Sequence, residues 1–176
     1  ADELAEKPDF ASLVESLLAM RADVVERIAA IDAKLRARAR TTPVCRRFMT
    51  VPGVGPITAL AVWAGIDDAA RFARPEDVGA YFGLTPRRYA SGEVNRSGRI
   101  TKRGDGTVRT LLYEAANVLL VKITRSCALR EWGLAIAKRS GFKKAKVAVA
   151  RKLAVLLHRL WRDGTEFRWS AAPAAV

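Results

Sequence analysis

Apolar residues near the N-terminus recur at alternating steps of four and three. The series runs Phe10, Val14, Leu17, Val24, Ile28, Ile31 and Leu35, with Arg21 in one of its positions. This spacing is the heptad seam of a coiled coil, with charged residues such as Glu15 and Arg27 on other faces. It predicts one long helix, either a coiled-coil arm that self-associates or a helix packed on its own domain. Thr41-Thr42-Pro43 ends the series, which places a boundary near residue 42.

The rest of the chain shows shorter helical patterns that proline and glycine interrupt. Helices are expected over about 43–50, 57–64, 75–83, 107–119, 129–138 and 143–162. The segment 86–106 has few large apolar residues, so a loop or a short hairpin is expected there. The predicted fold is therefore mainly all-α, with a helical arm over 1–42, a compact helical domain over 43–169 and a frayed tail over 170–176.

Composition narrows the class of protein. Half of the 176 residues are apolar, which is enough for a buried core, and 31 Lys plus Arg against 18 Asp plus Glu leave a net charge of +13. This excess favours polyanionic partners such as nucleic acid. No apolar run approaches the ~18 residues of a membrane span, so no membrane partner is expected. Cys45 and Cys127 lie far apart, which indicates neither a disulfide framework nor a zinc site and favours a reducing cytoplasm.

The turn Pro52-Gly53-Val54-Gly55 lies between two short predicted helices. Without Cβ atoms at Gly53 and Gly55, the turn can present backbone N–H groups to a phosphate. This is the arrangement of a helix-hairpin-helix element, which holds the DNA backbone without reading its sequence. The alternative is a tight interhelical turn whose glycines only permit close packing.

Two Ser-Gly pairs, Ser91-Gly92 and Ser97-Gly98, lie among basic residues in the segment 86–106. A serine hydroxyl becomes a nucleophile when a base or a cation stabilises the alkoxide, and cations also stabilise charge on a phosphoryl group. A phosphoserine link to DNA would conserve the bond energy, so strands could be rejoined without ATP. The residues alone favour the alternative, a solvated loop that only holds phosphates. The candidate phosphate contacts are Arg87, Arg88, Arg96, Arg99, Lys102 and Arg103, together with Arg109 in the next helix.

The last predicted helix is strongly basic, and Lys143, Lys144 and Lys146 are expected to contact nucleic acid. A merely solvated basic face is the alternative. The apolar stripe expected to face the core is Val147, Ala150, Ala154, Leu157 and Trp161. His158 falls on the basic side of this helix, so we interpret it as a surface residue without a catalytic role.

Two further groups of residues are interpreted as structural. The aromatic residues Trp132, Trp161, Phe167 and Trp169 are expected to close the core rather than to stack on bases. Asp67-Asp68 is expected to be a helix-end or capping pair, because no other acidic residues at metal-site spacing accompany it.

An ordered run of motifs resembles a known family. The motifs are Val51-Pro52-Gly53-Val54-Gly55-Pro56-Ile57-Thr58-Ala59, Phe72, Ala80-Tyr81-Phe82-Gly83-Leu84-Thr85-Pro86, Ser91-Gly92, Gly98-Arg99-Ile100-Thr101-Lys102-Arg103-Gly104 and Arg109-Thr110-Leu111-Leu112-Tyr113-Glu114-Ala115-Ala116. Together they resemble the C-terminal transposase domain of bacterial insertion-sequence transposases, the bridge-RNA-guided recombinases. The match is close over about residues 48–125, and residues 10–40 resemble the coiled coil that precedes that domain in the family.

The resemblance implies a bacterial, cytoplasmic DNA transposase whose C-terminal domain supplies a catalytic serine. The family serine follows the Gly-Leu-Thr-Pro motif, which makes Ser91 rather than Ser97 the implied nucleophile. The basic residues would hold DNA, and a structured RNA would guide the choice of target and donor. The family assembles as a multimer, so the arm is expected to join copies of this chain.

In the family, an N-terminal resolvase-like nuclease domain binds magnesium through four acidic residues, and this sequence has no counterpart of it. The chain opens Ala1-Asp2-Glu3 without a methionine, so we expect that a longer protein has been cut upstream. We expect no cofactor on this chain, magnesium in the missing nuclease domain, and no activity from these residues alone. Two other hypotheses stay open: a helical DNA- or RNA-binding module without chemistry, and a scaffold whose arm assembles subunits.

Overall fold

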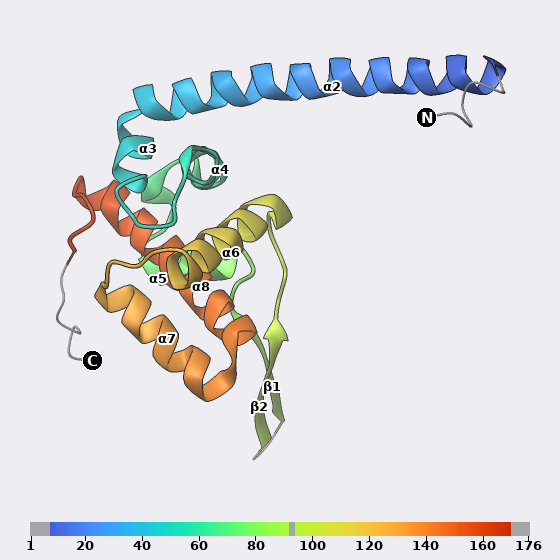
Figure 1. Cartoon of the computed structure of the whole chain (residues 1–176). Coiled ribbons are helices and arrows are strands. Elements are labelled where there is room, and N and C mark those ends of the chain that lie inside the picture. The colour runs from blue at the N-terminus through green and yellow to red at the C-terminus, as the bar shows by residue number, and fades with distance from the viewer. Residues whose placement is uncertain (1–7, 92–93, 170–176) are drawn as a thin grey trace. The chain divides into compact units, whose positions relative to one another are not determined.

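The computed structural model describes the backbone of residues 8–91 and 94–169, and the side chains of 10–87 and 98–169 (Figure 1). The chain forms two compact units, Ala1–Arg38 and Ala39–Val176. The described residues form seven α-helices, one 3-10 turn and one two-stranded sheet. The prediction of a mainly all-α fold is therefore confirmed.

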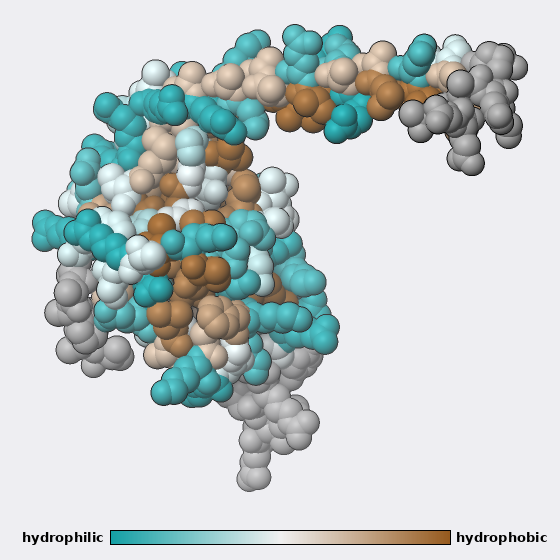
Figure 2. Space-filling model, viewed as in Figure 1, coloured by the Kyte–Doolittle hydropathy of each residue, from teal (hydrophilic) through white to brown (hydrophobic). Residues whose placement is uncertain are grey.

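The first unit consists of one continuous helix, α2 (Pro8–Thr41), which runs a few residues into the second unit. Nine large apolar side chains between Phe10 and Ile31 are each more than half exposed. Figure 2 shows apolar residues, in brown, along α2 between polar ones. The ion pairs Asp23–Arg27 and Asp32–Arg36, one turn apart, add about 0.3–0.5 kcal/mol each. The single long helix is confirmed, and its apolar seam is exposed.

Helix α8 (Phe142–Asp163) is the central element of the second unit. It packs against α3 (Pro43–Phe48), α5 (Pro75–Tyr81), α6 (Gly106–Val121) and α7 (Ala128–Ser140), and α6 also covers α4 (Pro56–Ile66). Prolines begin α3, α4 and α5, where the missing N–H costs nothing. The largest fully buried side chains include Phe48, Ile66, Phe82, Leu112, Leu119, Leu153 and Leu157.

The buried face of α8 is wider than the predicted stripe. Ala150, Ala154 and Leu157 are buried as expected, whereas Val147 and Trp161 are half-buried. His158 is fully buried, with its Nε2 2.8 Å from the carbonyl oxygen of Ala69 in the short 3-10 turn η1 (Ala69–Arg71). The interpretation of His158 as a surface residue was therefore wrong. Helices cover α8 on several sides, so residues beside the apolar stripe are buried too.

The other structural interpretations are confirmed. Trp132, Trp161, Phe167 and Trp169 are half-buried and pack against the core. Asp68 caps η1, because its Oδ1 accepts a 2.8 Å hydrogen bond from the N–H of Ala70. Asp67 lies at the C-terminal end of α4.

The segment 86–106 contains a hairpin of β1 (Pro86–Ser91) and β2 (Val94–Ile100), the second of the two predicted alternatives. The strands are antiparallel, with Arg88 opposite Ser97 and Ser91 opposite Val94, and the register is irregular between Pro86 and Arg88. In Figure 1 the hairpin extends away from the helices. The segment holds few large apolar residues, which explains why the sequence pattern did not separate a hairpin from a loop.

Candidate nucleic-acid interface

Two chain segments cross closely at the base of the hairpin, and we call residues 81–87 and 98–105 the hairpin root. Gly83 (φ +68°) and Gly104 (φ +77°) have left-handed backbone conformations. A Cβ at Gly83 would overlap the carbonyl oxygen of Arg103, and one at Gly104 would overlap that of Tyr81. Hydrogen bonds from the Lys102 N–H to the Gly83 oxygen (3.1 Å) and from the Thr101 N–H to the Thr85 oxygen (2.9 Å) join the segments. Only glycine permits this crossing.

Arg109 links both sides of the hairpin root to α6. Its Nη1 donates to the carbonyl oxygens of Phe82 (3.1 Å) and Arg103 (3.2 Å). Asp105 caps α6 by accepting hydrogen bonds from the N–H groups of Thr107 (2.7 Å) and Val108 (3.1 Å), which fixes the first turn that carries Arg109. The predicted phosphate contact of Arg109 stays a prediction, but its guanidinium already positions the root.

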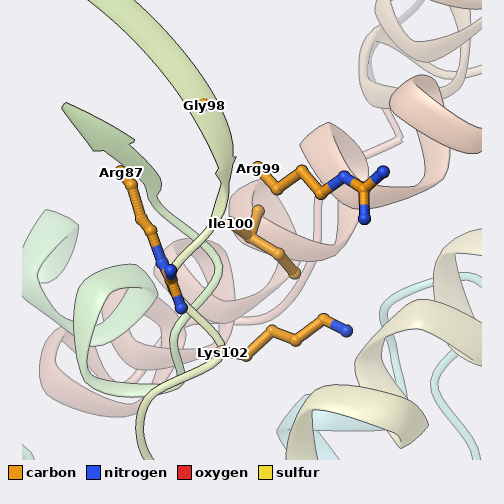
Figure 3. Close-up of a pocket in the computed structure, with 5 residues that line it drawn as sticks. All are labelled: Arg87, Gly98, Arg99, Ile100 and Lys102. Carbon is orange, nitrogen blue, oxygen red and sulfur yellow. The ribbon is translucent and has the colours of Figure 1, made fainter. Parts of the chain in front are cut away.

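Three basic side chains gather around a shallow pocket of about 320 Å³ at the hairpin root. Arg87, Arg99 and Lys102 line it, together with Gly98 and Ile100 (Figure 3). Arg87 donates a long 3.4 Å hydrogen bond to the Thr101 carbonyl oxygen. Within the described part of the chain, none of the three cations pairs with a carboxylate. Unpaired cations around one hollow attract an anion such as a phosphate group.

The predicted serines lie on the hairpin beyond this pocket. Ser91 is the last residue of β1, four residues from Arg87, which corresponds to about 13 Å along a strand. Ser97 lies in β2, two residues from Arg99 and opposite Arg88. The side chains of Ser91, Ser97, Arg88 and Arg96 lie outside the described residues. Arg103 is an exposed residue of the root.

The turn at Pro52–Gly55 packs against α6. Gly53 has φ +89°, and a Cβ there would overlap the carbonyl oxygen of Ala115, whereas a Cβ at Gly55 would meet open space. The structure therefore supports the close-packing alternative at Gly53. Phosphate binding by Gly53 and Gly55 stays a prediction.

Gly55→Ala is expected to leave the free energy of unfolding within about 0.5 kcal/mol, because the added methyl group meets no atom and φ at Gly55 is −91°. Gly53→Ala is expected to lose at least about 2 kcal/mol through overlap and backbone strain. Urea denaturation measures both. Since Gly55→Ala stays folded, weaker DNA binding by this variant would support a phosphate contact at the turn, and unchanged binding would contradict one.

Some basic side chains of α8 are exposed to solvent, whereas others contact aromatic rings or a carboxylate of the same chain. Lys143 and Lys144 are exposed, and Lys146 places its ammonium 5.7 Å from the ring centre of Tyr113 on α6. None of these three lines the pocket at the hairpin root. Further along, Lys152 lies over the Trp132 ring and Arg159 pairs with Glu76. A backbone hydrogen bond and the Arg159 guanidinium lower the pKa of the Glu76 carboxyl.

Two structural features are absent from the described residues. No helix among them is long and apolar enough to cross a membrane. They also contain no group of three His, Cys, Asp or Glu side chains placed to hold a metal ion. The described residues therefore do not fit the magnesium site of a nuclease.

The chain is similar to transposases of insertion sequences. It is 34% identical over 147 residues to the transposase of insertion sequence element IS1111A from Coxiella burnetii, and the alignment covers 83% of this chain and 40% of that protein. A protein of Pseudomonas aeruginosa named "Probable family 20 transposase" is 34% identical, with 81% and 42% covered. The transposase of element IS1328 from Yersinia enterocolitica is 32% identical, with 81% and 43% covered. The chain thus matches less than half the length of these relatives.

The model of the Transposase IS116/IS110/IS902 family matches residues 45–130. The matched segment begins within α3 and includes the glycine turn, the hairpin with its root, and α6 with Arg109. All of the basic α8 lies beyond it. Over residues 45–130, this chain is therefore similar to the domain of the Transposase IS116/IS110/IS902 family.

Proposed function

We propose that this chain is the DNA-handling C-terminal part of a serine-using transposase, and that Ser91 attacks a phosphodiester of DNA. In this step the Ser91 hydroxyl loses its proton to a base and forms an O–P bond. One P–O bond of the DNA backbone breaks, and the departing DNA oxygen takes up a proton. The observation that carries the proposal is the set of unpaired cations at the root of the hairpin that bears Ser91, within a transposase family domain.

In this proposal, the root cations hold the DNA beside the reacting phosphate. Arg87 lies about 13 Å from Ser91 along the strand, which favours contact of Arg87 with the DNA backbone next to the reacting phosphate. The root therefore holds the flanking backbone, while Gly83, Gly104 and Arg109 keep the hairpin in place on the helical unit. Orientation of this kind lowers the barrier because the reacting groups are held in position before the reaction.

The proposal includes a second domain in the full-length protein. We infer that a nuclease domain with magnesium acts with this chain, and that a structured RNA guides the choice of DNA. The experiment uses a protein carrying both domains, with magnesium, DNA from the element's end, and RNA transcribed from the element. A covalent protein–DNA adduct on a denaturing gel is expected. An adduct that forms equally without RNA would remove the guide from the proposal.

The second candidate function is a nucleic-acid-binding module without chemistry, which the excess of +13 favours. This hypothesis predicts DNA binding by the present chain and no adduct in the two-domain protein. Binding through six or more phosphates would weaken by about a thousandfold or more between 50 and 200 mM salt. Fluorescence anisotropy at several salt concentrations measures this loss, and a flat response would contradict electrostatic binding by either candidate.

We further propose that α2 joins two copies of the chain through its exposed seam. Val24 lies on the seam and Val25 beside it, and each is 52% exposed. Val24→Glu is expected to convert the oligomer to a monomer, because a buried charge in the seam has no partner. Val25→Glu, matched in size, charge and exposure, is expected to leave the mass in light scattering unchanged. Equal masses for the two variants would contradict a seam at Val24.

A further inference from the structure

The corner between α7 and α8 combines an exposed aromatic ring with free cations. Phe142, the first residue of α8, is 48% exposed. Among the described residues of the second unit, only Tyr81 and Val121 are other large apolar side chains with comparable exposure. Gly141 (φ +84°) turns the chain here, and a Cβ on it would meet open space. Lys138, Arg139, Lys143 and Lys144 flank the ring in sequence and are all exposed.

The charge at this corner is not neutralised locally. No acidic residue occurs between Glu131 and Asp163, a stretch that holds nine Lys and Arg. The four corner cations form no ion pair with any described residue, whereas Arg159 pairs with Glu76 and Arg162 with Asp163. The corner therefore presents uncompensated positive charge beside a ring that the fold does not cover.

We propose that the α7–α8 corner binds a single-stranded segment of nucleic acid, with an unpaired base stacked on Phe142. The flanking cations, Lys138 and Arg139 on one side and Lys143 and Lys144 on the other, take the phosphates of the neighbouring nucleotides. This proposal depends on one part of the proposed function, namely that the chain binds nucleic acid. It adds a second contact surface, since none of these residues lines the pocket at the hairpin root.

Two observations favour a single strand over other partners. A ring stacks on the face of an unpaired base, whereas the base faces in a duplex are already covered by their neighbours. One exposed ring among cations offers too little apolar surface for the core of a protein interface, from which lysine is depleted. The ligand is therefore a strand with accessible bases, which either DNA or RNA can supply.

The experiment measures the affinity of the 176-residue chain for fluorescein-labelled oligonucleotides of one length. Four probes are compared: single-stranded DNA, single-stranded RNA, duplex DNA, and a strand of the same backbone without bases. The variants are Phe142→Ala, Phe142→Tyr, which keeps the ring, and the double variant Lys143→Gln with Lys144→Gln. Val121→Ala removes an exposed apolar side chain elsewhere and serves as the control. Thermal unfolding verifies that each variant folds.

Phe142→Ala is expected to weaken binding of single strands by about 5- to 150-fold, the range for removal of one base–aromatic stack, and to spare the probe without bases. Phe142→Tyr and Val121→Ala should bind as the parent chain does. The lysine variant should weaken binding of all probes and reduce the salt slope by about 0.7 for each phosphate of a single strand that is no longer neutralised. A larger effect of Phe142→Ala on DNA or on RNA identifies the natural strand.

Equal losses for Phe142→Ala on strands with and without bases would overturn the stacking proposal, as would no loss at all. Neither result would affect the proposed transposase function if the hairpin-root variants Arg87→Gln and Lys102→Gln still weakened duplex binding. Failure of the parent chain to bind any probe would count against both. If Phe142→Ala failed to fold, Phe142→Leu would replace it, because leucine keeps an apolar side chain without a ring. Loss of base-dependent binding in Phe142→Leu would support stacking, and unchanged binding would overturn it.

Discussion

Ser91→Ala is expected to abolish the covalent protein–DNA adduct of the two-domain transposase, because removal of the hydroxyl leaves no oxygen to bond to phosphorus. The variant should still bind DNA, since the root cations Arg87, Arg99 and Lys102 are untouched. A denaturing gel measures the adduct, and anisotropy measures the binding. Loss of the adduct with retained binding separates the chemical step from DNA recognition.

Ser97→Ala is the matched control for this experiment, and it is a demanding one. Ser97 also precedes a glycine, and its position two residues from Arg99 brings it nearer to the root cations than Ser91. Proximity to the cations would favour Ser97, whereas the motif order favours Ser91. An adduct that survives in Ser91→Ala and disappears in Ser97→Ala would identify Ser97 as the nucleophile in place of Ser91.

Gly104→Ala is expected to cost more than about 3 kcal/mol of unfolding free energy, a large fraction of the usual 5–15 kcal/mol. The left-handed conformation at φ +77° costs an alanine about 1–2 kcal/mol. The methyl group must also displace the carbonyl of Tyr81, which separates the two segments of the hairpin root. Urea denaturation measures the stability, and DNA affinity should fall with it because Arg87 and Lys102 lose their arrangement.

Gly164→Ala isolates the overlap from the backbone strain. Gly164 has a left-handed conformation (φ +67°, ψ +16°), but an added methyl group meets no atom there. This variant is expected to lose only the strain of about 1–2 kcal/mol. Equal losses for Gly104→Ala and Gly164→Ala would show that the two segments of the root are not closely packed.

Local patterns in the sequence predicted most of the elements. Interruptions by proline and glycine and the apolar periodicity set the helices to within a few residues, because helical spacing and chain breaks depend on nearby residues. The seam of α2 was readable for the same reason. The positive charge of the segment 86–106 and of α8 could be predicted from the residue composition of these segments alone.

The tertiary structure decided which side chains these elements bury or use. His158 lies on the basic side of its helix in sequence, yet the turn at Ala69, far away along the chain, covers it. Arg109 was predicted to contact phosphate, but it also donates hydrogen bonds to the carbonyl oxygens of Phe82 and Arg103. Position 53 must be glycine because α6 passes so close that no Cβ fits there. Periodicity and charge describe neighbours along the chain, whereas burial, close crossings and shared pockets arise between distant segments. The sequence by itself thus determined the helices, the apolar seam and the basic segments, and only the tertiary structure determined the exposure of the seam, the hairpin root and its cation pocket.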